Sequence, residues 1–122
     1  MAFEIKIIRY FSAAHSLRGY KGKCEELHGH NWKVEVLVSS PKLNSLGMVL
    51  DFKELKDKLN KVLSLLDHRY LNEIDFFKKF NPTSENIARY IFENLKKNKL
   101  NVKLEAVTVW ESEDASATYK KR

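Results

Sequence analysis

The chain has 122 residues, of which 43% are hydrophobic and 31% charged, and its formal net charge is +6. This length fits one domain, residues 1–122, that can bury a core of its own. No run approaches the ~20 continuous apolar residues of a membrane helix, and a single cysteine excludes an internal disulfide. Because the first residues also lack a secretory signal pattern, we expect a cytoplasmic protein without membrane contacts.

The positive charge does not by itself indicate a nucleic-acid partner. The lysines are spread along the chain, and in KELKDKLNK (residues 53–61) they are interleaved with acids, as on a solvated helix face. We therefore expect no nucleic-acid partner. A nucleic-acid binder remains an alternative, and it predicts salt-sensitive DNA or RNA binding that needs no metal.

The first half of the chain begins with two predicted strands and continues into a helix. Residues 3–11, FEIKIIRYF, are rich in β-branched and aromatic side chains, and residues 30–40, HNWKVEVLVSS, alternate apolar and polar positions. Residues 51–66, DFKELKDKLNKVLSLL, have the apolar spacing of a helix, and Asp51 is a suitable N-cap with Glu54 three residues later.

The second half predicts another helix and two more strands. Residues 82–99, PTSENIARYIFENLKKNK, have a helical apolar stripe and begin with Thr83 or Ser84 as the N-cap. Residues 102–112 alternate as a strand, and residues 115–121 follow a turn as a short final strand. The order ββααββ predicts an α+β fold, with a four-stranded antiparallel sheet and two helices on one face. Because one sheet face and two edges stay uncovered, we expect a homo-oligomer.

Three histidines predict a metal site. His28 and His30 are two residues apart at the start of an extended segment, so their side chains point to the same side. His15 follows the first strand, and a hairpin of the first two strands would bring it to the same place. Three neutral imidazoles form the open type of zinc site, which leaves a position for water or substrate.

Two other metal-binding interpretations remain open. Cys24 would close the site as a fourth ligand, and the protein would then be a non-catalytic structural zinc module. The spacing G-x5-H-x-H-x4-E from Gly22 is also close to a cupin motif. However, the only later histidine is His68, and the helical segments do not fit an all-β fold.

Two further groups carry polar chemistry. Asp67 directly precedes His68, and a carboxylate beside an imidazole can tune it for proton transfer, although the pair also suits a polar helix end. Glu111 lies late in the third predicted strand, on the face opposite Trp110. Its carboxylate could bind the N–H groups of a flat heterocycle or simply be solvated.

Six segments of the chain resemble one enzyme family. They are FSAAHSL, CEELHGHNWKVEV, GMVLDFKELK, LDHRYLN, PTSENIARYI and VTVWES, and they cover nearly the whole chain. Together they resemble the family of 6-pyruvoyl-tetrahydropterin and 6-carboxy-tetrahydropterin synthases. The resemblance implies the tunnelling fold, in which the sheets of several subunits join into a barrel, usually as trimers stacked into hexamers.

The resemblance also implies a role for individual residues. The metal ligands for Zn²⁺ would be His15, His28 and His30. The catalytic set would be Cys24, Asp67 and His68, often shared between subunits. The pterin ring would be anchored by Glu111, with Thr83, Ser84 and Glu85 near the pocket. The substrate class implied is a pterin triphosphate, 7,8-dihydroneopterin triphosphate.

The product depends on the branch of the family. The spacing C-x3-H-G-H from Cys24 resembles the carboxy-forming enzyme of queuosine biosynthesis, which releases triphosphate and acetaldehyde. The pyruvoyl-forming enzyme places its cysteine farther from HGH. The folate branch makes 6-hydroxymethyl-dihydropterin with a glutamate in E-x2-H-G-H, and Glu25 stands at that position. We therefore expect the carboxy-forming activity, with the other two products as alternatives.

Overall fold

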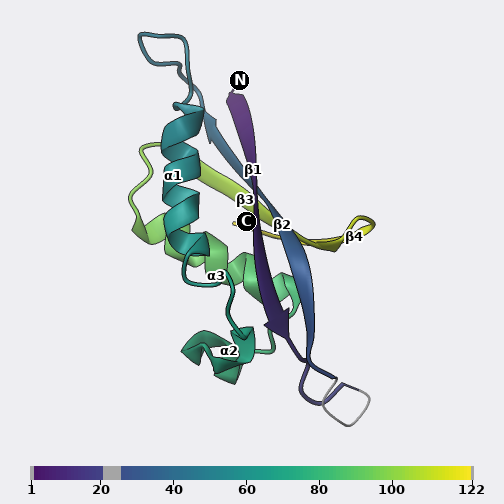
Figure 1. Cartoon of the computed structure of the whole chain (residues 1–122). Coiled ribbons are helices and arrows are strands. Elements are labelled where there is room, and N and C mark those ends of the chain that lie inside the picture. The colour runs from purple at the N-terminus through teal and green to yellow at the C-terminus, as the bar shows by residue number, and fades with distance from the viewer. Residues whose placement is uncertain (1, 21–25, 122) are drawn as a thin grey trace.

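The computed structural model describes residues 2–20 and 26–121. Four strands form one antiparallel sheet in the order β1-β2-β3-β4 (Figure 1). The strands are β1 (Phe3–His15), β2 (His28–Ser40), β3 (Lys103–Ser112) and β4 (Ala115–Lys120). Helices α1 (Phe52–Leu63) and α3 (Ser84–Lys97) lie on one face of the sheet. This architecture confirms the predicted α+β class and the order of its main elements.

The core lies between the sheet and the two helices. Strand β2 contributes most to it, because Trp32 and every second residue up to Val38 are fully buried. Leu55 and Leu59 of α1 and Ile91 of α3 are also fully buried and cover this face. Burying such side chains stabilises the fold by roughly 1.5–3 kcal/mol each. The alternation of apolar and polar residues in β2 therefore separates the side chains that face the core from those on the other face of the sheet.

Both helix starts predicted from the sequence are confirmed. The side chain of Asp51 accepts a hydrogen bond from the backbone N–H of Lys53, and the side chain of Thr83 accepts one from the N–H of Asn86. These bonds satisfy amide groups that have no partner within the helix. The cap at Thr83 matters for the site, because it fixes the chain immediately after Pro82.

The segment between α1 and α3 differs from the prediction. Helix α1 ends at Leu63 rather than residue 66, and two short helical segments follow, η1 (Leu71–Glu73) and α2 (Asp75–Lys79). The chain turns after Leu63, and the backbone N–H of His68 then donates to the carbonyl of Ser12 at 2.6 Å. Local turn hydrogen bonds continue as far as residue 67. The left-handed φ of 59° at His68 and its bond to β1 then end the helical course of the chain. Such non-local contacts have no short-range sequence pattern.

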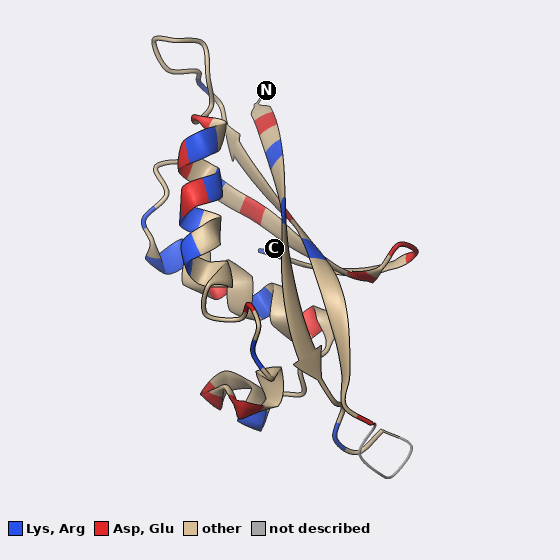
Figure 2. Cartoon of the chain, viewed as in Figure 1, with Lys and Arg blue, Asp and Glu red and all other residues tan. Residues whose placement is uncertain are grey.

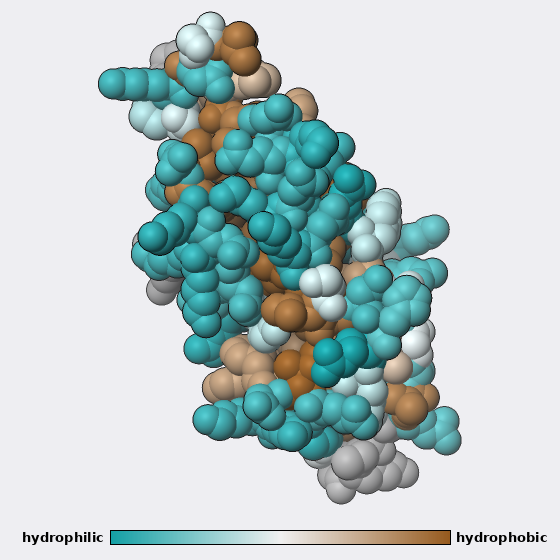
Figure 3. Space-filling model, turned by 60° about the vertical axis from the view of Figure 1, so that its left-hand side comes forward, coloured by the Kyte–Doolittle hydropathy of each residue, from teal (hydrophilic) through white to brown (hydrophobic). Residues whose placement is uncertain are grey.

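The sheet face away from the helices carries no other layer among the described residues. Tyr10, 66% exposed, and Ile8, 37% exposed, project from this face of β1. Figure 2 shows charged residues over the helices and strands, and the helix side in Figure 3 is mostly hydrophilic with apolar atoms visible between. Within the described part of the chain, no helix has the length and apolar character needed to cross a membrane.

Candidate metal centre

The strand register brings three histidines to one end of the sheet. His15 is paired with His28 in the last pair of the β1–β2 ladder, and His30 lies two residues further along β2. All three lie on the face that also carries Trp32, because residues two apart in a strand share a side. The hairpin predicted from the sequence is thus confirmed, and it places His15 beside the H-x-H pair.

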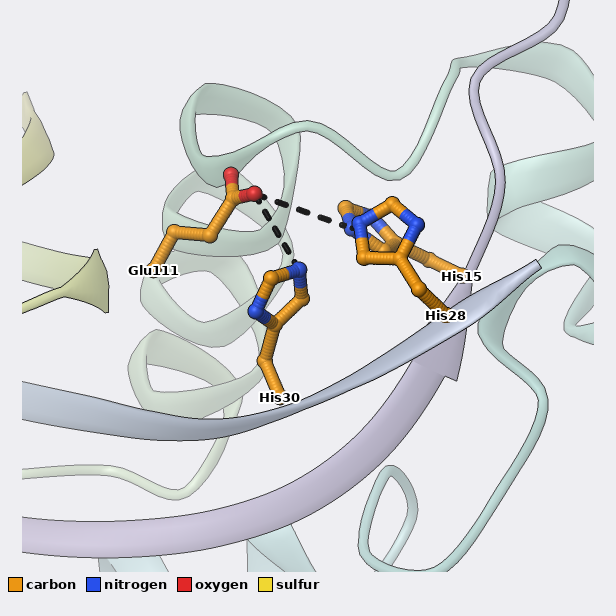
Figure 4. Close-up of side chains that lie close together, drawn as sticks. All are labelled: His15, His28, His30 and Glu111. Carbon is orange, nitrogen blue, oxygen red and sulfur yellow. Dashed lines mark hydrogen bonds and ion pairs between the residues drawn. The ribbon is translucent and has the colours of Figure 1, made fainter. Parts of the chain in front are cut away.

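Glu111 joins these histidines from the end of β3. One atom from each of His15, His28, His30 and Glu111 can be chosen so that all lie within 4.8 Å of one another. The Oε1 atom of Glu111 is 3.2 Å from Nε2 of His30 and 4.0 Å from Nε2 of His15. Figure 4 shows the three rings and the carboxylate converging from three strands. Such a group of nitrogen and oxygen donors could hold a metal ion.

Backbone carbonyls fix the orientation of two of the rings. The Nδ1 atom of His15 is 2.7 Å from the carbonyl oxygen of Pro82, and Nδ1 of His28 is 2.9 Å from that of Glu26. A carbonyl only accepts, so each Nδ1 carries the proton and donates it. In the neutral ring, Nε2 then holds the lone pair through which a histidine binds a metal.

The separation of these lone-pair atoms fits a single metal. Nε2 of His15 is 3.1 Å from Nε2 of His28. Two ligands at about 2.0–2.1 Å from a tetrahedral zinc ion lie ~3.3 Å apart. The donor set and its spacing therefore fit a metal of this kind, and the carbonyl contacts are the outer shell that ligating histidines usually have.

The site is buried on the side of His15 and open to solvent on the side of Glu111. The side chain of His15 is 2% exposed, that of His30 is 22% exposed and that of Glu111 is 38% exposed. Trp32 lies beneath, with its ring edge-on to His15 at 4.9 Å and to His30 at 5.1 Å between centroids. Its indole N–H donates to the carbonyl of Ala13 at 3.3 Å. A small molecule could thus approach a metal from the Glu111 side.

Comparison with known proteins decides the family. A sequence model described as 6-pyruvoyl tetrahydropterin synthase matches residues 4–122. The chain belongs to this synthase family. It is therefore an enzyme of the tetrahydropterin synthase type, and such enzymes are lyases. The resemblance seen in the sequence is confirmed.

Relatives within the family carry more than one activity in their names. A protein of Archaeoglobus fulgidus, provisionally named 6-carboxy-5,6,7,8-tetrahydropterin synthase, is 49% identical over 90% of this chain and 89% of its own length. The dihydroneopterin monophosphate aldolase of Pyrococcus furiosus is 41% identical over 85% of each chain. The structure of Caenorhabditis elegans 6-pyruvoyl tetrahydropterin synthase is 33% identical, with a TM-score of 0.87 over 100% of this chain and 97% of that one.

The Asp67–His68 pair is not part of the group formed by the three histidines and Glu111 in this synthase chain. Asp67 Oδ1 accepts from the backbone N–H of Ser12 at 2.9 Å, and its Oδ2 is 3.1 Å from Nδ1 of His68. The bond from Ser12 is the main reason that the pKa of Asp67 lies below its usual value, and His68 lowers it further. The side chain of His68 is 82% exposed. The pair therefore presents an imidazole to solvent at the outer edge of β1.

The remaining predicted residues divide into those the structure describes and those it does not. Thr83 and Ser84 form the start of α3, immediately after the carbonyl of Pro82 that contacts His15. Cys24 and Glu25 lie outside the described residues.

Trp32 and Pro82 were not predicted as parts of the site. Their contacts depend on tertiary packing, and only the position of Trp32 next to the HGH segment could have suggested one of them.

Proposed function

We propose that the chain is a zinc-dependent 6-carboxy-5,6,7,8-tetrahydropterin synthase. It would convert 7,8-dihydroneopterin triphosphate and one water molecule to 6-carboxytetrahydropterin, triphosphate and acetaldehyde, in queuosine biosynthesis. The observation that carries the proposal is the convergence of Nε2 of His15 and Nε2 of His28 on one point beside His30 and Glu111. The name of the relative in Archaeoglobus fulgidus supports the carboxy-forming branch.

The metal ligands in this proposal are His15, His28 and His30. A zinc ion held by neutral imidazoles would polarise the hydroxyl groups of the substrate side chain and acidify its neighbouring carbons. Glu111 would accept hydrogen bonds from the N–H groups of the pterin ring, which suits an acceptor 38% exposed at the open side of the site. Thr83 and Ser84 would line the pocket from the start of α3.

The proton transfers are assigned to Cys24, Asp67 and His68. Cys24 would act as a thiolate on one side of the substrate side chain, since a nearby cation favours the charged form of a thiol. Asp67 would orient His68 through the 3.1 Å contact between Oδ2 and Nδ1, which leaves Nε2 of His68 to exchange a proton with the substrate.

An oligomer would complete this site. The side chain of His68 is 82% exposed beside the edge strand β1, so in this proposal a second copy would bring its metal site to His68. We propose a homo-oligomer, a hexamer of two stacked trimers, in which neighbouring sheets join edge to edge. This arrangement would also cover the outer edges of β1 and β4. Among the described residues neither edge pairs with a further strand of the sheet, although the segment after α1 already bonds to the end of β1. A cytoplasmic location is part of the same proposal.

A second candidate activity concerns Glu25. The relative in Pyrococcus furiosus is named dihydroneopterin monophosphate aldolase, and the folate-branch pattern E-x2-H-G-H is satisfied by Glu25. The chain would then cleave the side chain to give 6-hydroxymethyl-dihydropterin, with Glu25 as the base. A pyruvoyl product is the third alternative, on the name of the structure from Caenorhabditis elegans.

Product identification separates these activities. The zinc-loaded protein is incubated with 7,8-dihydroneopterin triphosphate, and the pterin products are identified by mass. A carboxy product supports the proposal, whereas a hydroxymethyl or pyruvoyl product assigns the chain to another branch. Cys24→Ala tests the structural-ligand alternative in the same assay. We expect zinc to be retained and turnover to be lost, and loss of zinc would make Cys24 a ligand instead.

A further inference from the structure

A pocket lies at the opposite end of α3 from the candidate metal centre. The N-terminal end of α3 adjoins Pro82, which contacts His15. The 14 residues of the helix span about 21 Å at 1.5 Å per residue. At its C-terminal end, a pocket of about 310 Å³ opens between the helix, the following loop and the start of β3. It is therefore separate from the site already described.

The pocket combines basic and apolar walls, and we name it the lysine pocket. Its basic residues among those described are Lys96, Lys99, Lys103 and Lys121. Its apolar residues are Phe92, Leu100, Val102 and Leu104. No acidic residue lines it within the described part of the chain. Lysines from α3, the loop, β3 and the C-terminal segment thus meet around one apolar floor, and Figure 2 shows blue segments at the end of α3 and in the loop after it.

Capping of α3 does not account for these lysines. Cations are favoured near the C-terminus of a helix. However, Lys58 of α1 already donates to the carbonyl of Asn98, the C-cap residue, at 3.1 Å. Lys103 and Lys121 come from outside the helix, so its dipole gives no reason for their arrival at the same pocket.

Lys121 lies close enough to Lys96 for their charges to oppose each other at Lys121. The side-chain contact with Lys96 lowers the pKa of Lys121, and Glu93 only partly opposes this effect. Glu105, 3.6 Å from Lys103, offsets one more charge. Among the described residues, these two acids lie outside the pocket lining and offset only part of the charge of its four lysines, so a bound anion would relieve the rest.

We propose that the lysine pocket binds a nucleoside polyphosphate. The phosphates would accept hydrogen bonds from the lysine ammonium groups, and the base would pack against the apolar floor that includes Phe92. The volume is at the lower end of the range for small-molecule sites. An apolar floor within a basic rim favours such a ligand over a bare phosphate ion, which would leave the floor exposed. This site goes beyond the proposed synthase activity.

The test titrates ATP into the zinc-loaded full chain by calorimetry, with excess Mg²⁺ so that ATP does not remove zinc. We expect Lys96→Gln/Lys121→Gln to weaken binding about tenfold or more, because two charge-assisted hydrogen bonds are lost. The control Lys61→Gln/Lys79→Gln removes the same charge from exposed positions outside the pocket and should change the dissociation constant by less than about twofold. Tripolyphosphate should bind more weakly than ATP, and adenosine should not bind measurably.

Several results would overturn the proposal. ATP binding that weakens equally in both double variants would be a general charge effect. Binding that survives Lys96→Gln/Lys121→Gln but is lost in His28→Ala would belong to the metal centre. No binding at millimolar ATP, or pocket-dependent binding of a DNA oligonucleotide alone, would also contradict it. If Lys96→Gln/Lys121→Gln does not fold, Lys99→Gln replaces it with an expected loss of about threefold or more.

Discussion

The imidazoles of His15 and His28 face each other through Nε2 at 3.1 Å, and the Nδ1 atom of each lies against a backbone carbonyl. The two carbonyls belong to Pro82 and Glu26, which are far apart in the sequence. The backbone just before β2 and the backbone just before α3 therefore each select, in one ring, the tautomer needed for metal binding. The orientation of these two rings is thus fixed by the fold and does not depend on a bound metal.

Zinc should stabilise the fold through this prepared site. At a free zinc concentration about 100 times the dissociation constant, the free energy of unfolding rises by ~2.7 kcal/mol. For a chain of this length that corresponds to an increase in Tm of about 10 °C. Thermal unfolding with zinc and with a chelator measures it. His28→Ala should abolish the increase and His68→Ala should retain it, whereas an equal increase in both would place the metal elsewhere.

Trp32 should stabilise both the core and the metal group. It is fully buried and touches two of the three rings, so Trp32→Phe leaves space beneath them. We expect a loss of about 2 kcal/mol in the free energy of unfolding and weaker zinc binding. Trp110→Phe, on the other face of the sheet, is the matched control and should leave the zinc affinity unchanged. Equal zinc affinities in the two variants would show that Trp32 does not position the ligands.

Glu111 should act on the substrate rather than on the metal. Glu111→Gln keeps the size of the side chain but removes its charge, so the zinc content should remain that of the wild type. The value of kcat/KM should fall about 100-fold, because a charged acceptor for the pterin N–H groups is lost. Metal analysis and steady-state kinetics on the same sample test this. Loss of zinc in Glu111→Gln would instead make Glu111 a ligand.

Asp67 should make stability depend on pH in the acid range. Its pKa is lower in the folded chain than its ordinary value of 3.8, so the folded state favours the charged form. The stabilisation is present above pH 3.8 and is lost as the pH falls through the folded pKa. Urea unfolding of wild type and Asp67→Asn should show a larger difference at pH 7 than at pH 3. A difference that grows at acid pH would contradict the lowered pKa.

The sequence predicted the parts of the site that depend on local pattern. The alternation of β2 placed His28 and His30 on one side, and the hairpin placed His15 beside them. The proximity of Glu111 to these histidines required the β2–β3 register, which contains an irregularity at Leu37 and Val38 that no short-range signal reveals. The contact of Pro82 with His15 spans 67 positions and likewise has no local pattern.

The position of the Asp67–His68 pair shows the same division. The sequence identified the two residues, and helix periodicity placed them near the end of α1. The bonds to Ser12 that hold the pair at the edge of β1 arise from packing of α1 against that strand. In the proposed oligomer the imidazole of His68 would serve a neighbouring chain, and a contact between chains has no local pattern in the sequence of one chain.

The most direct test of the central claim is product analysis with 7,8-dihydroneopterin triphosphate before and after zinc removal. The zinc-loaded chain should form 6-carboxytetrahydropterin together with triphosphate and acetaldehyde. The chelated chain should form none, and added zinc should restore turnover. A chain that binds one zinc ion yet leaves this substrate unchanged, or that turns it over equally well without metal, would contradict the account.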